Sequence, residues 1–281
     1  MYNRNDNKFS KNDRQRKNDK FSGNDRPKKE ENSERPERQE RDDLIIGRNA
    51  VKEALKAGRP ADSLLVQRGE LSGSIRPIIA ECKEKGIIVK EVDSKKLDFM
   101  CGHAHHQGVI MIAAAHEYST VEEILKKAEE KNEAPFIVIC DGLEDPHNLG
   151  AIIRTADAAG AHGVIIPERR SVSLSGIVGK TSAGALEYVP VARVKNITNT
   201  IKDLKEKGIW VYCADMDGTP YRKADLSGAI ALVVGGEGSG VSRLVKENCD
   251  GVLSIPMKGN VNSLNASVAA AVLIFEASLT R

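Results

Sequence analysis

The chain has 281 residues, of which 40% are hydrophobic, and this is enough for one large domain or two smaller ones. Its 42 Lys and Arg residues nearly balance its 40 Asp and Glu residues, so bulk charge gives no argument for nucleic-acid binding. The five scattered cysteines include no Cys-x-x-Cys pair, which disfavours disulfides and a zinc site and favours a reducing cytoplasm, and no apolar run of about 18 residues predicts a membrane span.

Residues 1–43 are polar and charged, and we expect them to be a disordered tail. They lack the apolar stretch of a secretory signal. Residues 1–29 carry ten basic against four acidic residues, and residues 30–43 carry three against seven. The basic part could hold an RNA backbone, and the alternative is a solubilising tail without a partner.

Residues 44–115 alternate between helical and strand patterns, which predicts a small α/β domain. The expected helices cover residues 47–55 and 75–85, and the expected strands cover residues 63–67, 87–89 and 107–113. A short helix and a linker then fill residues 116–134. Ser119 or Thr120 can cap this helix, with Glu122 or Glu123 completing a capping box.

Residues 135–281 predict a larger α/β domain. The expected strands cover residues 136–140, 163–166, 209–213, 229–234 and 252–255. The expected helices cover residues 149–159, 198–207, 241–247 and 264–279. Near-continuous apolar strands that alternate with helices indicate a parallel sheet covered on both faces. Ligands of such sheets usually lie beyond the carboxyl ends of the strands.

Three segments of this larger domain could carry chemistry. The first follows a strand at Asp141 and contains Asn148, a natural helix N-cap, and Arg154. The second, residues 235–240, places four glycines around Glu237, but its spacing does not match the dinucleotide fingerprint or a phosphate loop. In the third, a polar loop after Pro256 leads to an alanine-rich helix that Ser263 could cap.

Histidines gather before one expected strand of the smaller domain, at residues 103, 105 and 106. Metal ligation is the less favoured interpretation, and hydrogen bonding or RNA contact is favoured over it. The domain has Phe99 as its only large ring between residues 44 and 115, so we expect contact with RNA shape and backbone instead of base stacking. The expected contacts are Arg48, Lys52, Arg59, Arg68 and the histidines.

In their order and spacing, the three segments resemble the three motifs of the SpoU (TrmH-like) family of RNA 2′-O-ribose methyltransferases, part of the SPOUT superfamily. Asn148 and Arg154 form N-x-x-x-x-x-R, residues 235–240 form G-G-E-G-x-G, and residues 255–267 contain I-P-M and S-L-N-x-S. Residues 44–115 resemble the L30e-like substrate-binding domain of one branch of the family, through residues 47–51 and 106–109. The layout is similar to bacterial enzymes that methylate a guanosine of 23S ribosomal RNA.

The resemblance implies a fold and an organisation. We expect a knotted (trefoil) parallel-sheet α/β methyltransferase domain at residues 135–281, preceded by an L30e-like RNA-binding domain at residues 44–115. The implied cofactor is S-adenosyl-L-methionine, the implied partner is RNA, with ribosomal RNA favoured, and the implied assembly is a cytoplasmic homodimer. Neither a membrane nor a metal is expected.

The resemblance also implies roles for single residues. The catalytic set would be Arg154, Asn148, Glu237, Ser263 and Asn265, and the cofactor-binding set would be Gly235, Gly236, Ile255, Met257 and Leu264. Because an arginine stays protonated, we expect Arg154 to stabilise the developing alkoxide or the adjacent phosphate, with Glu237 fixing its position. A second residue or the phosphate would take the proton of the 2′-hydroxyl.

Two alternatives stay open at this point. A transfer RNA could be the substrate, although the smaller domain favours ribosomal RNA. A non-catalytic RNA-binding protein could also keep the fold, and the intact motif residues argue against this alternative. An unrelated nucleotide-binding protein is disfavoured because neither phosphate-binding motif matches.

Overall fold

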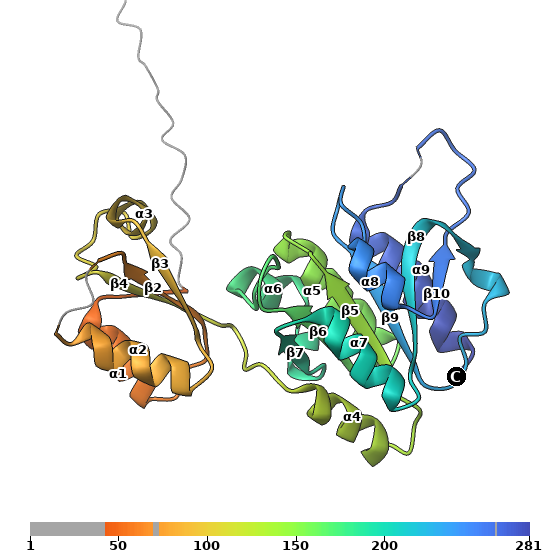
Figure 1. The fold of residues 1–281 in the computed structure, drawn as a ribbon, viewed down its shortest axis with the longest axis horizontal. Coiled ribbons are helices and arrows are strands. Elements are labelled where there is room, and N and C mark those ends of the chain that lie inside the picture. Colours follow the sequence, from red (N-terminus) through yellow and green to blue (C-terminus); the bar gives the residue numbers. More distant parts are fainter. Residues whose placement is uncertain (1–42, 70–72, 262) are drawn as a thin grey trace, which may run out of the picture. The chain divides into compact units, whose positions relative to one another are not determined.

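The computed structural model describes residues 43–69, 73–261 and 263–281, which form two separate β-sheets with their helices (Figure 1). Of the expected charged tail, only Asp43 lies within the described residues, so the role of the tail stays a prediction. No helix within these three ranges is long and apolar enough to cross a membrane.

Residues 44–113 form the first unit, which we call the four-stranded domain. Its elements are β1 (Leu44–Ile46), α1 (Arg48–Lys56), β2 (Ala61–Gln67), α2 (Ile75–Glu84), β3 (Ile88–Val92), α3 (Ser94–Met100) and β4 (Val109–Ala113). The strand order is β1-β4-β2-β3, with β2 and β3 parallel and β4 antiparallel to its neighbours. Leu55 and Ile78 belong to one buried cluster, and Leu97 of α3 belongs to a second with Leu65 and Ile110.

Residues 121–279 form the second unit, the six-stranded domain. Its helices are α4 (Val121–Glu130), α5 (Pro146–Ala158), α6 (Gly176–Thr181), α7 (Ile197–Glu206), α8 (Arg243–Asn248) and α9 (Ala266–Leu279). Its strands are β5 (Phe136–Asp141), β6 (Gly163–Pro167), β7 (Val191–Val194), β8 (Trp210–Pro220), β9 (Ile230–Gly235) and β10 (Gly251–Ser254). Two 3-10 turns, Ala185–Glu187 and Tyr221–Lys223, complete it.

All strands of the six-stranded domain pair in parallel, in the order β10-β8-β9-β5-β6-β7 (Figure 1). One buried cluster combines the sheet with α5, α6 and α9, for example through Ile153, Val178 and Leu273. A second combines it with α4, α7 and α8, for example through Ile124 and Leu204. The predicted parallel α/β fold is therefore confirmed, and the trefoil knot stays a prediction.

Several element boundaries differ from those predicted. β8 continues to Pro220, well past the expected end at Cys213, and the short elements β1, α3, α6 and β7 were not predicted. Of the two capping boxes considered for α4, the one formed by Thr120 and Glu123 is present. This helix packs on the larger sheet, where the side chain of Ile124 fills the space above Gly163.

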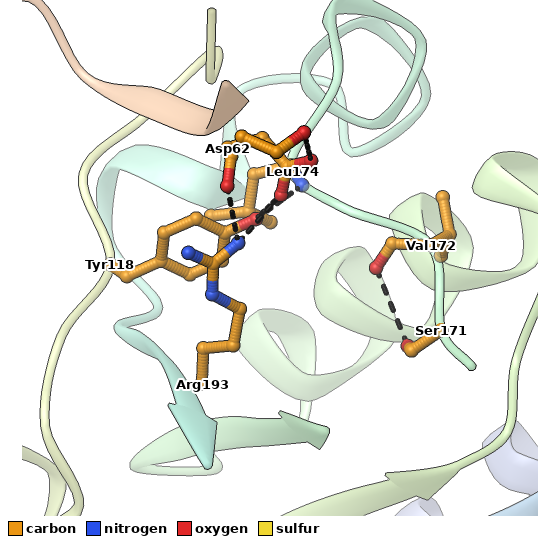
Figure 2. A network of polar contacts seen from close by, with 7 residues as sticks. Asp62, Tyr118, Ser171, Val172, Leu174 and Arg193 are labelled. Carbon is orange, nitrogen blue, oxygen red and sulfur yellow. Dashed lines mark hydrogen bonds and ion pairs between the residues drawn. The ribbon is translucent and has the colours of Figure 1, made fainter. Parts of the chain in front are cut away.

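A buried polar network connects β2 of the four-stranded domain with β7 of the six-stranded domain (Figure 2). The guanidinium of Arg193 donates to the Asp62 carboxylate at 2.6 Å and lies 4.0 Å from the centre of the Tyr118 ring. The Tyr118 hydroxyl donates to Asp62 and accepts from the backbone N–H of Leu174. Burial raises the pKa of Tyr118, so the hydroxyl stays protonated and can keep donating.

Candidate functional site

The three segments singled out from the sequence meet at one edge of the larger sheet. They follow the carboxyl ends of β5, β9 and β10, where ligands of parallel sheets usually bind. β5 and β9 are neighbours in register, with Asp141 opposite Gly235. The Asp141 carboxylate also accepts from the backbone N–H of Ser242 at 2.7 Å, which closes the glycine-rich loop onto the first segment.

Asn148 has a different place in its helix from the one predicted. The N-cap of α5 is Asp145, whose carboxylate accepts from the backbone N–H of His147, and Pro146 takes the first helical position. Asn148 is therefore inside the first turn, and the prediction that it caps the helix is wrong. Asn148 is buried, with 4% exposure. Because it does not cap the helix, its side-chain amide is available for contacts with other loops.

Asn148, Glu237 and Asn265 form a hydrogen-bonded triangle, and each residue comes from a different segment. The amide of Asn148 donates to Glu237 Oε1 at 3.0 Å. The amide of Asn265 donates to the same Glu237 oxygen at 2.5 Å and to Asn148 Oδ1 at 3.0 Å. These contacts fix the relative positions of three loops that are far apart in the sequence.

Asn265 has a second role as the N-cap of α9. Its Oδ1 accepts from the backbone N–H groups of Ser267 and Val268, so the expectation that Ser263 caps this helix is wrong. One asparagine thus uses its oxygen for the helix and its nitrogen for the triangle. Ser263 lies close by, in the wall of the adjacent pocket.

Arg154 is exposed on α5, six residues after Asn148. The predicted contact between Glu237 and Arg154 is wrong, because both atoms that bind the Glu237 carboxylate come from asparagines. Within the described part of the chain, no hydrogen bond or ion pair involves the Arg154 guanidinium. Its charge is therefore available to a bound molecule.

A cavity of about 640 Å³ lies beside the triangle, and we call it the glycine-loop pocket. Its walls come from the glycine-rich loop, the β8 segment 214–216, the loop after β10 and the start of α9. All five residues predicted to bind a cofactor line it: Gly235, Gly236, Ile255, Met257 and Leu264. Of the predicted catalytic residues, Glu237, Ser263 and Asn265 also line it.

The first two glycines of the loop are required by close backbone contacts. A Cβ atom on Gly235 would lie 2.0 Å from the carbonyl carbon of Gly240, and one on Gly236 would lie 2.3 Å from the carbonyl oxygen of Gly142. Neither clash can be relieved by rotating a side chain, because both neighbours are backbone atoms. The loop therefore folds tightly and presents main-chain atoms to the pocket.

The sequence interpretation missed one wall of this pocket, which comes from residues 214–216 at the start of the five-residue β8 segment 214–218. β10 pairs with Cys213 and then directly with Thr219, so these five residues bulge out of the ladder. Asp215 lines the pocket from this bulge and forms an ion pair with Lys246 at 2.9 Å. The hydrogen bond from Lys246 lowers the pKa of Asp215, so the carboxylate is ionised at neutral pH.

A second cavity of about 650 Å³ lies in the four-stranded domain, and we call it the histidine hollow. Polar residues from the start of α1, the end of β2, the N-cap of α2, α3 and the loop before β4 line it: Arg48, Asn49, Gln67, Ser74, Asp98, His103, His105, His106 and Gln107. The Gln107 side chain accepts from the backbone N–H of Arg48 at 2.9 Å and so takes the place of a cap on α1. Of the predicted RNA contacts, Arg48 and the three histidines line this hollow, and Lys52, Arg59 and Arg68 do not.

The three histidines of this loop differ in burial. His106 is buried, accepts from the backbone N–H of Gly108 with Nδ1 and places Nε2 3.1 Å from Asp98. His103 and His105 are exposed. Among the residues that the structure describes, no group of three or more His, Cys, Asp or Glu side chains is arranged to hold a metal ion.

Comparisons with known proteins match each of the two domains to a protein family. Residues 135–275 match the SpoU rRNA Methylase family, and residues 44–119 match the RNA 2′-O ribose methyltransferase substrate binding family. The chain is similar to YacO of Bacillus subtilis, named for the TrmH family of tRNA/rRNA methyltransferases, with 49% identity over 83% of this chain and 94% of that protein. A Staphylococcus aureus protein named for the same family is 48% identical over 84% and 95% of the two chains.

Solved structures of two methyltransferases are also similar to this chain. The SpoU methyltransferase AviRb from Streptomyces viridochromogenes, crystallised with the cofactor AdoMet, is 25% identical with a TM-score of 0.53, over 84% of this chain and 89% of that one. An AdoMet-bound rRNA methyltransferase from Sinorhizobium meliloti is 27% identical with a TM-score of 0.51, over 83% and 85%.

Proposed function

Because this chain belongs to the SpoU rRNA Methylase family of RNA methyltransferases, we propose that it methylates the ribose 2′-hydroxyl of a guanosine in 23S ribosomal RNA. The cofactor of the family is S-adenosyl-L-methionine. The observation that carries the proposal is the triangle of Asn148, Glu237 and Asn265 beside the glycine-loop pocket. It joins all three family motifs in one place.

The glycine-loop pocket suits S-adenosyl-L-methionine in size and chemistry. Its volume of about 640 Å³ lies in the range of small-molecule sites. Main-chain atoms of Gly235 and Gly236 can approach an adenosine closely, and Ile255 and Leu264 supply apolar surface for its ring. When bound, the cofactor supplies a methyl group on a positively charged sulfur, which an oxygen nucleophile can accept.

The residues of this chain would position the ribose and assist loss of its proton. The triangle holds the three loops rigidly, and positional control is the main requirement of an in-line displacement. We assign Arg154 the role of stabilising the developing alkoxide or the neighbouring phosphate, because its charged guanidinium has no protein partner among the described residues. Ser263 would orient the ribose from the pocket wall.

A homodimer is the assembly we propose. α9 is strongly hydrophobic and has no distinct polar face, which is usual for a helix covered by protein. Yet the described residues leave Val268, Phe275 and Leu279 of this helix 49%, 46% and 81% exposed. A second copy of the chain would cover them. Light scattering on the purified protein at several concentrations measures this directly.

The histidine hollow is our candidate for the RNA-recognition site, and we propose the cytoplasm as the location of the protein. Family resemblance assigns substrate binding to residues 44–119, and this polar cavity is lined by Arg48, Asn49 and the exposed histidines. Such groups can contact phosphate, sugar and unpaired base edges without a stacking platform. Ribosomal RNA is the proposed target, and transfer RNA is the alternative, because the relatives are named for both.

The decisive variant is Arg154→Ala. We expect methyl transfer to ribosomal RNA to fall by about 100-fold or more, as when one stabilising donor of an oxyanion is removed. Cofactor affinity should stay within about twofold, since Arg154 does not line the glycine-loop pocket. Tritiated-methyl transfer measures the first quantity, and titration calorimetry measures the second.

Arg243→Ala is a matched control, because Arg243 is also an exposed arginine on a helix of the same domain. It should keep both values. Mapping of 2′-O-methylation in 23S ribosomal RNA and transfer RNA, with and without the gene, identifies the target. Normal turnover by Arg154→Ala would contradict the assignment, and cofactor binding by the wild type without any transfer would favour a non-catalytic RNA-binding protein.

A further inference from the structure

Charge is distributed unevenly in the wall of the glycine-loop pocket. Among the described lining residues, Asp215 and Glu237 are the only charged ones, and both are acidic. Glu237 Oε1 already accepts two hydrogen bonds from the asparagines of the triangle. Asp215 is thus the carboxylate of the pocket that does not belong to the three family motifs.

The bulge of β8 holds Asp215 in a fixed position. Lys246 binds Asp215 Oδ2 at 2.9 Å, and the backbone N–H of Asp217 donates to Oδ1 at 3.3 Å. The bulge closes at Gly218, whose missing Cβ would lie 2.6 Å from the carbonyl oxygen of Val252, and the hydroxyl of Ser254 donates to the Gly218 oxygen. Because both carboxylate oxygens of Asp215 are held by contacts, the side chain does not need to become ordered when a ligand binds.

The ion pair with Lys246 does not remove this charge from the pocket. Asp215 lines the cavity and Lys246 does not. The acidic residue of the pair is therefore the one that borders a ligand in the cavity, and the interaction between charges falls with distance.

We propose that Asp215 is a cofactor-binding residue that distinguishes S-adenosyl-L-methionine from its demethylated product, S-adenosyl-L-homocysteine. The two molecules share their adenosine, amino and carboxylate groups and differ by the sulfonium methyl, which gives the first one additional positive charge. An ionised carboxylate in the wall attracts that charge and has no such attraction for the neutral sulfur of the product. Loss of the charge on methyl transfer then weakens the hold on the product and favours exchange.

This inference rests on the proposed function, and calorimetric binding tests it without any catalytic readout. S-adenosyl-L-methionine and S-adenosyl-L-homocysteine are titrated into the full-length wild type, Asp215→Asn and Lys246→Met. Both variants break the same ion pair, but only Asp215→Asn removes the carboxylate from the pocket. Asp215→Glu serves as a variant that keeps the charge.

We expect Asp215→Asn to weaken binding of S-adenosyl-L-methionine by about tenfold and of the product by less than about threefold. Lys246→Met should not weaken S-adenosyl-L-methionine, and Asp215→Glu should keep the wild-type ratio of the two affinities. Sinefungin, which carries an amine at the corresponding position, should follow S-adenosyl-L-methionine.

Two results would overturn the inference alone. Equal losses for both ligands in Asp215→Asn, or the same pattern in Lys246→Met, would mean that the ion pair only supports the fold. Absence of binding of either molecule by the wild type would instead overturn the proposed function, and the inference with it.

Discussion

The glycine-loop pocket and the histidine hollow have similar volumes, about 640 and 650 Å³, but different walls. The first is shaped largely by main chain, with glycines at the closest contacts and apolar side chains around them. The second is lined mainly by polar side chains. A pocket wall made of backbone tolerates few substitutions, and it suits a ligand that is the same in all related enzymes. A wall of side chains can be altered residue by residue, which suits a target that differs between related enzymes.

The largest effect should follow from adding one methyl group to the backbone-lined wall. In Gly235→Ala the new Cβ would lie 2.0 Å from backbone, so the loop must open. We expect cofactor affinity to fall by at least about 100-fold, roughly 2.7 kcal/mol, in titration calorimetry. Gly176→Ala is the control, because nothing lies within 4 Å of its Cβ position. Unchanged cofactor affinity in Gly235→Ala would contradict the statement that the backbone-lined wall tolerates few substitutions.

A smaller effect is expected from removing side chains of the histidine hollow. His103→Gly combined with His105→Ala keeps the positive φ of residue 103 accessible and deletes both exposed rings. We expect ribosomal RNA to bind about tenfold more weakly at fixed salt, in fluorescence anisotropy, because roughly 1.4 kcal/mol of polar contact is lost.

The matched control for the hollow is His116→Ala, a half-buried histidine that lies outside it. It should keep the affinity for RNA, and both proteins should keep their affinity for the cofactor. A parallel loss of cofactor affinity in the double variant would mean that the two cavities are not independent.

The smallest expected effect is a pH dependence of stability that comes from His162 in the six-stranded domain. This histidine makes the same kinds of contact as His106 in the four-stranded domain. Like His106, His162 accepts a backbone N–H with Nδ1 and faces a carboxylate with Nε2, but its side chain is fully buried. Burial lowers the pKa of His162, so the unfolded chain takes up a proton before the folded chain does. This contribution to stability is complete above about pH 6.5 and is lost as the pH falls below it.

Urea unfolding between pH 7.5 and 5.5 measures this contribution as the difference between the wild type and His162→Gln. One group can change the free energy of unfolding by at most about 1.4 kcal/mol per pH unit. The difference should shrink toward acidic pH. A difference that does not depend on pH would show that His162 contributes only packing.

Much of the fold was predictable because apolar runs and helical spacing are local properties of the chain. β5, β6 and β9 lie within a residue or two of their predicted ranges. The bulge of β8 was not predictable, since it arises from the pairing of Cys213 and Thr219 with adjacent residues of β10. No local pattern records a register between strands, and so Asp215 was missed.

The site shows the same division. Sequence motifs indicated which residues to examine, and the structure brings Asn148, Glu237 and Asn265 together. Local rules failed for the helix caps, because Asp145 and Asn265 cap where Asn148 and Ser263 also have suitable side chains. The partner of Glu237 could not be deduced, since two asparagines compete with Arg154 for it and only three-dimensional placement decides between them.

The contact between Asp62 and Arg193 has a consequence for protein engineering. Target specificity is often exchanged by grafting one domain of an enzyme onto another. In this chain a graft of residues 44–115 would carry away Asp62 and leave the Arg193 guanidinium, whose side chain is 9% exposed, without its carboxylate. An uncompensated buried charge costs about 3–5 kcal/mol, a large fraction of the roughly 5–15 kcal/mol that keeps a typical domain folded. A chimera therefore needs an acidic residue at the position of Asp62, whatever RNA its new domain binds.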